Sequence, residues 1–136
     1  MIQFEFTNKP APTDIDLLTQ KINEETSEYG EATSFAFFAY DEDEKMIGGC
    51  NGFVLFGEIY IDQLWVDQAN RKSGIGKKLM EKVHDYGLLK NCTMVTVTTM
   101  SFQGALEFYQ KLGYNIDFER KGYYKNSSSF YLSRKL

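Results

Sequence analysis

The segment whose residue types and spacing point most clearly to a binding site contains two glycines at the start of a predicted helix. Arginine and lysine residues stand on both sides of these glycines. Residues 64–79 read LWVDQANRKSGIGKKL, so an apolar run leads into Gly74 and Gly76 and then into an amphipathic pattern. Glycine lets the backbone approach a ligand closely, while the unpaired N–H groups of a first helical turn and the positive end of the helix dipole favour an anion. The spacing predicts a phosphate site.

The letters of this loop argue against two common phosphate motifs. A Walker loop requires G-x-x-x-x-G-K-[ST], but Arg71 stands at its first glycine and Lys78 at its Ser or Thr. A dinucleotide fingerprint requires a third glycine at the position of Leu79. What remains is R-x-x-G-x-G after a strand that ends in Leu-x-Val. An ordinary strand-to-helix turn, in which glycine only permits tight packing, would carry the same letters.

A second motif favours a ligand site over an ordinary turn. Residues 105–114 read ALEFYQKLGY and follow the pattern A-x-x-F-Y-x-K-x-G-[FY]. With R-x-x-G-x-G upstream, the chain resembles the GNAT superfamily of N-acetyltransferases. Residues 61–66 and 99–103 also resemble a bacterial subgroup in which LWV and SFQ segments recur. The resemblance covers residues 33–136 well, and the region before them only by placement.

The resemblance implies acetyl-CoA as cosubstrate, with its pyrophosphate in the glycine loop and its pantetheine arm paired with the backbone of Leu64 and Val66. At Lys72 and Ser73 the chain departs from the Arg-Gly of many relatives, so we expect a stiffer loop in which Ser73 replaces part of that contact. The lysines at the start of the helix suit phosphate, although a solvated helix face would look the same. The implied cofactor-binding residues are Leu64, Val66, Arg71, Lys72, Ser73, Gly74, Ile75, Gly76, Lys77 and Phe108.

N-acetyl transfer requires the movement of protons. A primary ammonium, with a pKa of about 10.4, must lose a proton, and the departing thiolate must gain one. The resemblance implies that Tyr109 is the general acid for the thiolate. The alternative is that Tyr109 is a core aromatic whose hydroxyl is simply hydrogen-bonded.

Two carboxylates, Glu58 and Asp62, are the candidate bases. Their even spacing would place them on one face of a regular strand, together with Tyr60, Leu64 and Val66. A β-bulge, which this strand commonly carries in the family, would break that parity and expose backbone groups able to bind pantetheine as an extra strand. Either carboxylate could instead face solvent, and a water relay could replace both.

Composition limits the other possibilities. A chain of 136 residues without a linker or repeat fits a single domain, 1–136. The start lacks a signal-peptide pattern and no window approaches the roughly 18 apolar residues of a membrane span, so we expect a cytoplasmic protein that binds no membrane. Cys50 and Cys92 lack metal-ligand spacing, so we expect reduced, buried thiols and no metal. The single histidine, His84, is expected at the surface.

Charge is polarised along the chain. Residues 1–67 hold 3 Lys+Arg and 14 Asp+Glu, whereas residues 68–136 hold 12 and 5. The basic second half suits a polyanionic cofactor, and the acidic first half could face a cationic acceptor. The acidic run at residues 41–44 is better explained as a solvated hairpin tip. The acidic balance, without a basic-aromatic platform, argues against nucleic acid as a partner.

Hydrophobic periodicity predicts the elements that must position these residues. Helices are expected at residues 13–30, 74–89 and 104–112, the last with Gly113 as its cap. Only one helix is readable between the first two strands, where the family usually has two short ones. The expected strands are residues 2–6, 33–40, 46–56, 58–66, 94–99, 116–120 and 130–132, the last two joined by a loop at 126–129.

The resemblance implies an α+β GNAT fold: a mixed, mostly antiparallel sheet of about seven strands with helices on both faces and splayed fourth and fifth strands. It implies an acetyl-CoA-dependent N-acetyltransferase that acetylates a primary amine of a small molecule by direct transfer in a ternary complex. Neither cysteine has a nucleophile setting, which argues against an acetyl-enzyme. The alternatives are a non-catalytic CoA-binding or regulatory module and a protein N-acetyltransferase. Dimers through the C-terminal strands are common in the family, so a homodimer is expected by analogy.

Overall fold

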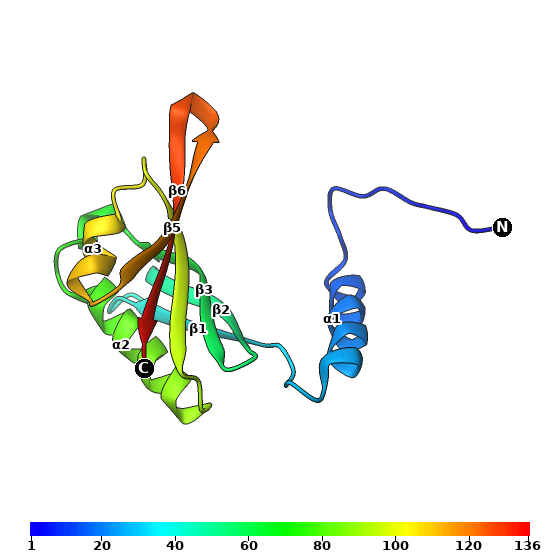
Figure 1. Ribbon diagram of the computed structural model, residues 1–136. Helices are drawn as coiled ribbons and strands as arrows, with labels where there is room; N and C mark the ends of the chain where they lie inside the picture. Colours follow the sequence, from blue (N-terminus) through cyan, green and yellow to red (C-terminus); the bar gives the residue numbers. More distant parts are fainter.

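One mixed sheet of six strands runs through the computed structural model, which describes residues 1–136 (Figure 1). Its order is β1-β2-β3-β4-β6-β5, and only β3 and β4 are parallel. This confirms the mixed, mostly antiparallel α+β architecture. The strands are β1 (Thr33–Tyr40), β2 (Met46–Leu55), β3 (Glu58–Val66), β4 (Met94–Met100), β5 (Asn115–Tyr123) and β6 (Ser127–Lys135). The helices are α1 (Pro12–Thr26), α2 (Ile75–Leu89) and α3 (Leu106–Lys111).

The core lies between the sheet and the two helices α2 and α3, which stand on the same side of it in Figure 1. The apolar stripe of α2 buries Met80 and Val83 against Ile59 and Val95, because alternate strand residues point to this face. Tyr109 of α3 joins the same cluster. None of the three helices combines the length and apolar character that a membrane crossing requires.

The parallel strands β3 and β4 diverge about halfway along their length. They pair over four positions, from Glu58 opposite Met94 to Ile61 opposite Val97. Both strands continue beyond that point, β3 to Val66 and β4 to Met100, without pairing each other. The expected splay is therefore confirmed, and it leaves an opening between the two strands.

A β-bulge lies at the root of this opening. The register of β2 and β3 shifts between Asn51, which faces Gln63, and Gly52, which faces Ile61, so Asp62 has no partner in β2. A Cβ atom on Gly52 would overlap the carbonyl oxygen of Tyr60, so only glycine fits there. The bulge explains why the strand contains this glycine.

The N-terminal region differs from the expectation. The strand predicted at residues 2–6 is wrong for the single chain, because these residues are fully extended from the body and pair with nothing (Figure 1). The helix expected to run to about residue 30 ends at Thr26, and it buries no residue. The sheet therefore has six strands, and packed helices cover only one of its faces.

The final hairpin is longer than predicted. Its loop was expected at residues 126–129, but a short 3-10 turn, Tyr124–Asn126, makes the connection instead. Ser127 and Ser129 belong to β6, where they pair with Tyr123 and Arg120. Positive φ angles at Lys125 (55°) and Asn126 (60°) explain how the chain reverses without glycine at these positions.

Candidate active site

The opening between β3 and β4 presents a free backbone edge. Beyond Ile61, β3 is hydrogen-bonded only to β2, so its edge toward β4 carries unpaired N–H and C=O groups. Leu64 and Val66 direct their side chains to the core, while Gln63 and Trp65 are exposed on the other face. The bulge has thus broken the parity expected for a regular strand, since Tyr60 lies on the face opposite to Leu64. An extended ligand could pair with this edge as an additional strand.

The edge leads to the N-terminus of α2, where a set of backbone N–H groups lacks partners. The N-cap, Gly74, has a φ of 87°, and no side chain caps the helix. Lys78 makes the first helical hydrogen bond, to the Gly74 carbonyl at 3.0 Å, and the N–H groups of residues 72–77 make none within the chain. Unpaired N–H groups at the positive end of a helix dipole suit a phosphate.

Side chains of the loop are partly engaged within the chain. Arg71 donates from Nε to the Val66 carbonyl at 2.9 Å, which ties the loop to the end of β3 and leaves its terminal guanidinium nitrogens available. Ser73 donates its hydroxyl hydrogen to the Asn70 carbonyl, so this hydroxyl would have to leave that carbonyl to replace a phosphate contact. Lys72 has a φ of 63°, a left-handed conformation that bends the backbone between Arg71 and Ser73.

The two sequence motifs meet at Gly76 and Phe108. A Cβ atom on Gly76 would lie 3.3 Å from Cζ of Phe108, so the ring of α3 packs directly on the first turn of α2. Phe108 also stands edge-on to Tyr109, with ring centroids 5.2 Å apart. Phe108 therefore supports the loop through its contact with Gly76.

Tyr109 is buried beside Phe108, with its ring 5.5 Å from that of Tyr114. Burial, and secondarily the nearby Cys50, raises the pKa of the Tyr109 hydroxyl well above its usual value. The hydroxyl is therefore protonated at neutral pH and can act as a hydrogen-bond donor. Burial likewise raises the pKa of Cys50 to about 12, and neither cysteine is in a disulfide, so the expectation of reduced, buried thiols is confirmed.

The two candidate bases occupy different places. Asp62 is exposed and is the first residue of β3 beyond the last pair with β4, so it stands at the root of the opening. Glu58 lies at the closed end of the paired segment, where its carboxylate accepts a hydrogen bond from the Thr96 hydroxyl. The four residues from Glu58 to Asp62 correspond to about 13 Å of extended strand. The structure thus brings Asp62, and not Glu58, to the opening.

Comparison with known proteins identifies the family of this chain. The model of the acetyltransferase (GNAT) family matches residues 3–114. The chain belongs to this family. It is 32% identical over 87 residues to a blasticidin-S acetyltransferase of Streptomyces morookaense, a match that covers 60% of each chain. The chain therefore spans about 60% of the length of that curated relative, which is less than two thirds.

Solved structures share the fold over nearly the whole length of this GNAT chain. An acetyltransferase from Bacillus cereus ATCC 14579 matches with a TM-score of 0.76 at 22% identity, covering 97% of this chain and 98% of its own. An aminoglycoside 6′-N-acetyltransferase complexed with coenzyme A matches with a TM-score of 0.68 at 18% identity, covering 99% and 97%. At these identities the likeness shows the fold alone.

His84 of this GNAT domain is buried, which corrects the expectation that it lies at the surface. It is 8% exposed, with Nε2 at 2.7 Å from the Tyr114 hydroxyl and Nδ1 at 3.0 Å from Nη1 of Arg134. Because arginine only donates, Nδ1 accepts and Nε2 carries the proton that it donates to Tyr114. Burial, followed by the charge of Arg134, lowers the pKa of His84 to about 4. His84 is thus a neutral link between α2, β6 and the segment that joins α3 to β5.

One buried polar atom near the opening was not anticipated from the sequence. Oδ1 of Asn51 is buried without a hydrogen-bond partner, on β2, where Asn51 faces Gln63 next to the bulge of β3. Buried carbonyl oxygens without partners are uncommon in folded proteins. The pair Asn51-Gly52 inside an apolar strand was the available signal, because glycine there marked the bulge.

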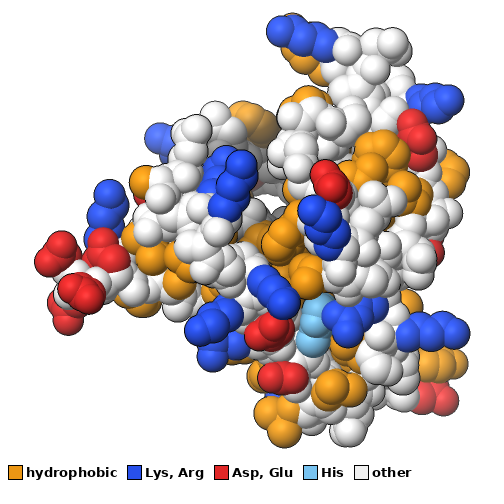
Figure 2. Space-filling view, turned by 90° about the vertical axis from the view of Figure 1, so that its left-hand side faces the viewer, with side chains coloured by type: hydrophobic (Ala, Val, Ile, Leu, Met, Phe, Trp, Pro, Cys, Tyr) orange, Lys and Arg blue, Asp and Glu red, His pale blue; other side chains and the backbone are white.

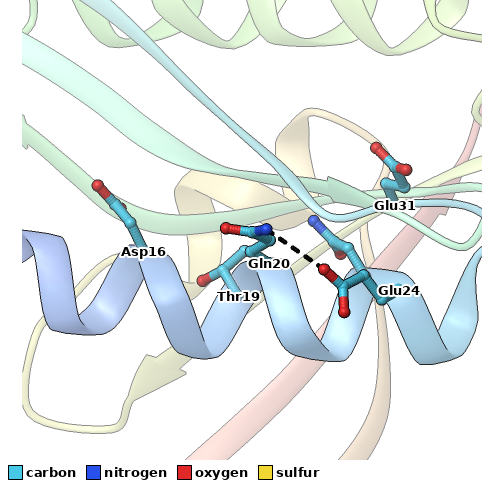
Figure 3. Close-up of a pocket in the computed structure, with 6 residues that line it drawn as sticks. Asp16, Thr19, Gln20, Glu24 and Glu31 are labelled. Carbon is cyan, nitrogen blue, oxygen red and sulfur yellow. Dashed lines mark hydrogen bonds between the residues drawn. The ribbon is translucent and has the colours of Figure 1, made fainter.

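Figure 2 views the GNAT domain from the side of α2 and α3 and shows Lys and Arg side chains spread over this face, with Asp and Glu side chains among them and an acidic cluster at its left-hand tip. A hollow of about 440 Å³ lies along α1 (Figure 3), is lined only by residues of polar or charged type, and shares no residue with the opening. In it Gln20 donates to Glu24 at 3.3 Å. The residues that line it are Asp16, Thr19, Gln20, Asn23, Glu24 and Glu31.

Proposed function

We propose that this protein is an acetyl-CoA-dependent N-acetyltransferase that acetylates a primary amine of a small molecule by direct transfer in a ternary complex. The observation that supports it best is the continuity of two binding features. The free edge of β3 beyond Ile61 leads into the unpaired N–H groups of residues 72–77 at the start of α2. The edge of β3 suits the extended, amide-bearing pantetheine group of CoA. The N–H groups suit the pyrophosphate to which pantetheine is joined.

Binding would use backbone more than side chains. The peptide groups of Leu64 and Val66 would pair with the pantetheine arm, and the N–H groups of the loop would hold the pyrophosphate. The free guanidinium nitrogens of Arg71 and the ammonium groups of Lys72 and Lys77 would add positive charge. Phe108, packed on Gly76, would keep the loop in position.

The reaction would take place at the root of the opening. Acetyl-CoA, when bound, supplies a thioester whose carbonyl carbon can accept a nucleophile. Asp62, directly or through a water molecule, would take the first proton that the acceptor ammonium loses. The amine nitrogen would then bond to that carbon, the carbon–sulfur bond would break with its electron pair on the sulfur, and the nitrogen would lose its second proton to solvent.

Tyr109 would donate a hydrogen bond to the departing sulfur. Its pKa lies well above that of an ordinary thiol, about 8.5, so complete proton transfer from Tyr109 would be uphill. The thiolate would therefore be stabilised by the hydroxyl and would take its proton from solvent, leaving an amide and the free thiol of CoA as products. The general-acid role proposed for Tyr109 from the family resemblance thus becomes one of electrostatic stabilisation.

A small amine is the acceptor class that we propose. The curated relative that matches this chain is named for acetylation of blasticidin S, and a structural neighbour is named for acetylation of aminoglycosides. Both names denote small molecules. The acidic first half of the chain suits a cationic acceptor.

Thiol release from acetyl-CoA over an amine panel tests the proposal. The panel contains blasticidin S, an aminoglycoside, a polyamine, free amino acids and a peptide with a free N-terminus, with a reaction lacking amine as the control for hydrolysis. We expect release with at least one small amine above the control, with one acetyl group added to that amine. Tight CoA binding without release would instead support a non-catalytic module, and release only with the peptide would support a protein N-acetyltransferase.

A further inference from the structure

The first 31 residues, which we call the arm, expose their apolar side chains. Phe4 and Phe6 are 93% and 89% exposed, and Ile2 is nearly as open. In α1, Leu18 and Ile22 lie on one face of the helix, and both are more than half exposed. Figure 1 shows the arm standing clear of the sheet. A soluble chain rarely leaves so much contiguous apolar surface without a partner.

The body of the molecule has an open face that matches the arm. The face of the sheet opposite α2 is covered by no helix, and Phe38 of β1 and Trp65 of β3 are 53% and 49% exposed on it. These two residues lie in one row across the sheet, since each is in register with Gly49 of β2 between them. Phe53 adds a further exposed ring on β2. The ring of Phe38 lies over Gly49, where a Cβ atom would come within 2.9 Å of Cδ1 of that ring.

The sheet also has a free edge beside this face. β1 is hydrogen-bonded to β2 alone, so its outer edge is open. Residues 2–6 alternate apolar and polar side chains as a strand does, yet no strand lies beside them in the chain. Residues 2–6 could therefore pair as a strand with the free edge of β1.

The arm is part of the domain. The match to the GNAT family begins at residue 3, and the Bacillus cereus structure covers 97% of the chain. The arm is thus included in both matches, although in the single chain it contributes no residue to the core. In the single chain, the first quarter of the matched domain is therefore not packed on the rest.

Hydrogen bonds hold the connection between the arm and β1 in the conformation that directs the arm away from the sheet. Asn23 of α1 donates from Nδ2 to the Ala32 carbonyl at 3.2 Å, and the Ala32 N–H donates back to Oδ1 of Asn23 at 2.8 Å. Thr26 donates its hydroxyl to the Gly30 carbonyl at 3.2 Å. These bonds fix α1 relative to the start of β1 over a link of only six residues, 27–32. A short, braced link favours exchange of the arm between copies over folding back onto its own sheet.

We propose that two copies of this chain exchange their arms, so that the arm of each covers the open sheet face of the other. In the exchanged dimer, residues 2–6 extend the sheet at the free edge of β1 of the partner, and the apolar face of α1 packs over the row of Phe38 and Trp65. A stable interface of ordinary size takes roughly 20–30 residues from each side, and the arm provides that number. Reciprocal exchange gives a closed, two-fold dimer.

The exchange also bears on the opening. Trp65 lies between Leu64 and Val66, so an arm packed on Trp65 would form a wall beside the free edge of β3. This consequence rests on the proposed function, whereas the exchange itself does not. The experiment below therefore reads mass and amide protection, and its failure would leave the acetylation assay unaffected.

Light scattering after size exclusion, combined with hydrogen exchange, tests the exchange. We expect the full chain to be a dimer in which the amides of residues 2–6 and of α1 are protected. The double variant Phe4→Asp and Phe6→Asp should be monomeric or at least tenfold weaker in dimerisation. The matched control is Leu89→Asp, since Leu89 is 74% exposed at the end of α2, away from both the arm and the open face; it should stay dimeric. Circular dichroism would verify that each variant is folded.

A longer link separates exchange from folding back. Inserting about eight Gly/Ser residues after Ser27, together with Asn23→Ala, removes the brace and lets the arm reach its own sheet. We expect this variant to become a monomer whose arm is still protected. A wild-type monomer, with the arm protected or not, would overturn the proposal. So would a dimer with an unprotected arm, or one that dissociates with Ile116→Asp on edge strand β5 and not with the arm variants.

Discussion

Ile61 of β3 and Val97 of β4 form the last of the four parallel pairs between these strands. Beyond Ile61 the edge of β3 toward β4 has no strand beside it, and the bulge opposite Asn51 and Gly52 occurs at the same place. The opening and the bulge thus begin at the same residue. Asp62 lies at the root of the opening because Ile61, the residue before it, is the last residue of β3 that pairs with β4.

This position predicts that the two candidate bases behave differently. Asp62→Asn should lower kcat by about 100-fold, because a positioned base typically contributes 10²- to 10⁴-fold. Glu58→Gln is the matched control: it also removes one carboxylate of β3 but can still accept the hydrogen bond of Thr96, and it should change kcat only a few-fold. Steady-state kinetics of both variants provide the test. A large loss in Glu58→Gln with normal turnover in Asp62→Asn would reverse the assignment.

Tyr109→Phe should lower kcat roughly 10- to 100-fold while leaving the KM for acetyl-CoA within a few-fold, because the hydroxyl acts on the departing sulfur. The raised pKa of Tyr109 adds a pH prediction: the wild-type rate should not fall as pH rises to 10, since the hydroxyl keeps its proton. Tyr114→Phe removes a neighbouring hydroxyl that bonds to His84, and serves as the control. Unchanged turnover in Tyr109→Phe would remove Tyr109 from the reaction.

Charge reversal in the loop should weaken CoA binding. Lys72→Glu places a negative charge beside the unpaired N–H groups, so the Kd for CoA should rise about tenfold, which corresponds to about 1.4 kcal/mol. Lys125→Glu is a close control, because Lys125 also has a positive φ, 55° against 63° for Lys72, and lies in the turn between β5 and β6. Isothermal titration calorimetry measures both. Equal affinities for the two variants and the wild type would show that this loop does not hold the phosphates.

The buried His84 predicts a loss of stability in acid. Its pKa is about 4 in the folded chain against about 6.5 when unfolded, so between these values the unfolded chain binds more protons. The free energy of unfolding should therefore fall as pH decreases from about 6.5 to 4, by about 1–2 kcal/mol with partial screening by solvent, and the contribution is complete above 6.5. Urea unfolding at pH 7 and pH 4.5 measures the change. His84→Gln keeps a donor and an acceptor without titrating, so its loss should be smaller; an equal loss would exclude His84 as the cause.

Local pattern was sufficient for most elements of this fold. The apolar residues of α2 recur at helical spacing, and β1 and β2 surround a charged turn, so both were predictable from neighbours in sequence. The splay of β3 and β4 was expected only from family resemblance. The bulge at Asp62 depends on how Gly52 meets Tyr60 in the next strand, and such pairing is not written in either strand alone.

Two failures have the same physical origin. His84 looks like a surface residue in its helix, but its partners Tyr114 and Arg134 come from positions 30 and 50 residues away in the chain. Residues 2–6 have the alternation of a strand, yet a strand forms only where an edge is within reach. Both outcomes depend on distant contacts rather than on local preference.

The central claim is that the opening between β3 and β4 and the loop before α2 serve acetyl transfer to a small amine. The most direct measurement is the mass of each small amine after incubation with the protein and acetyl-CoA, alongside the thiol released. We predict that one amine gains a single acetyl group in an amount equal to the thiol formed, and that Asp62→Asn slows both together. Thiol release without an acetylated amine, or no release with any small amine despite bound CoA, would contradict the claim.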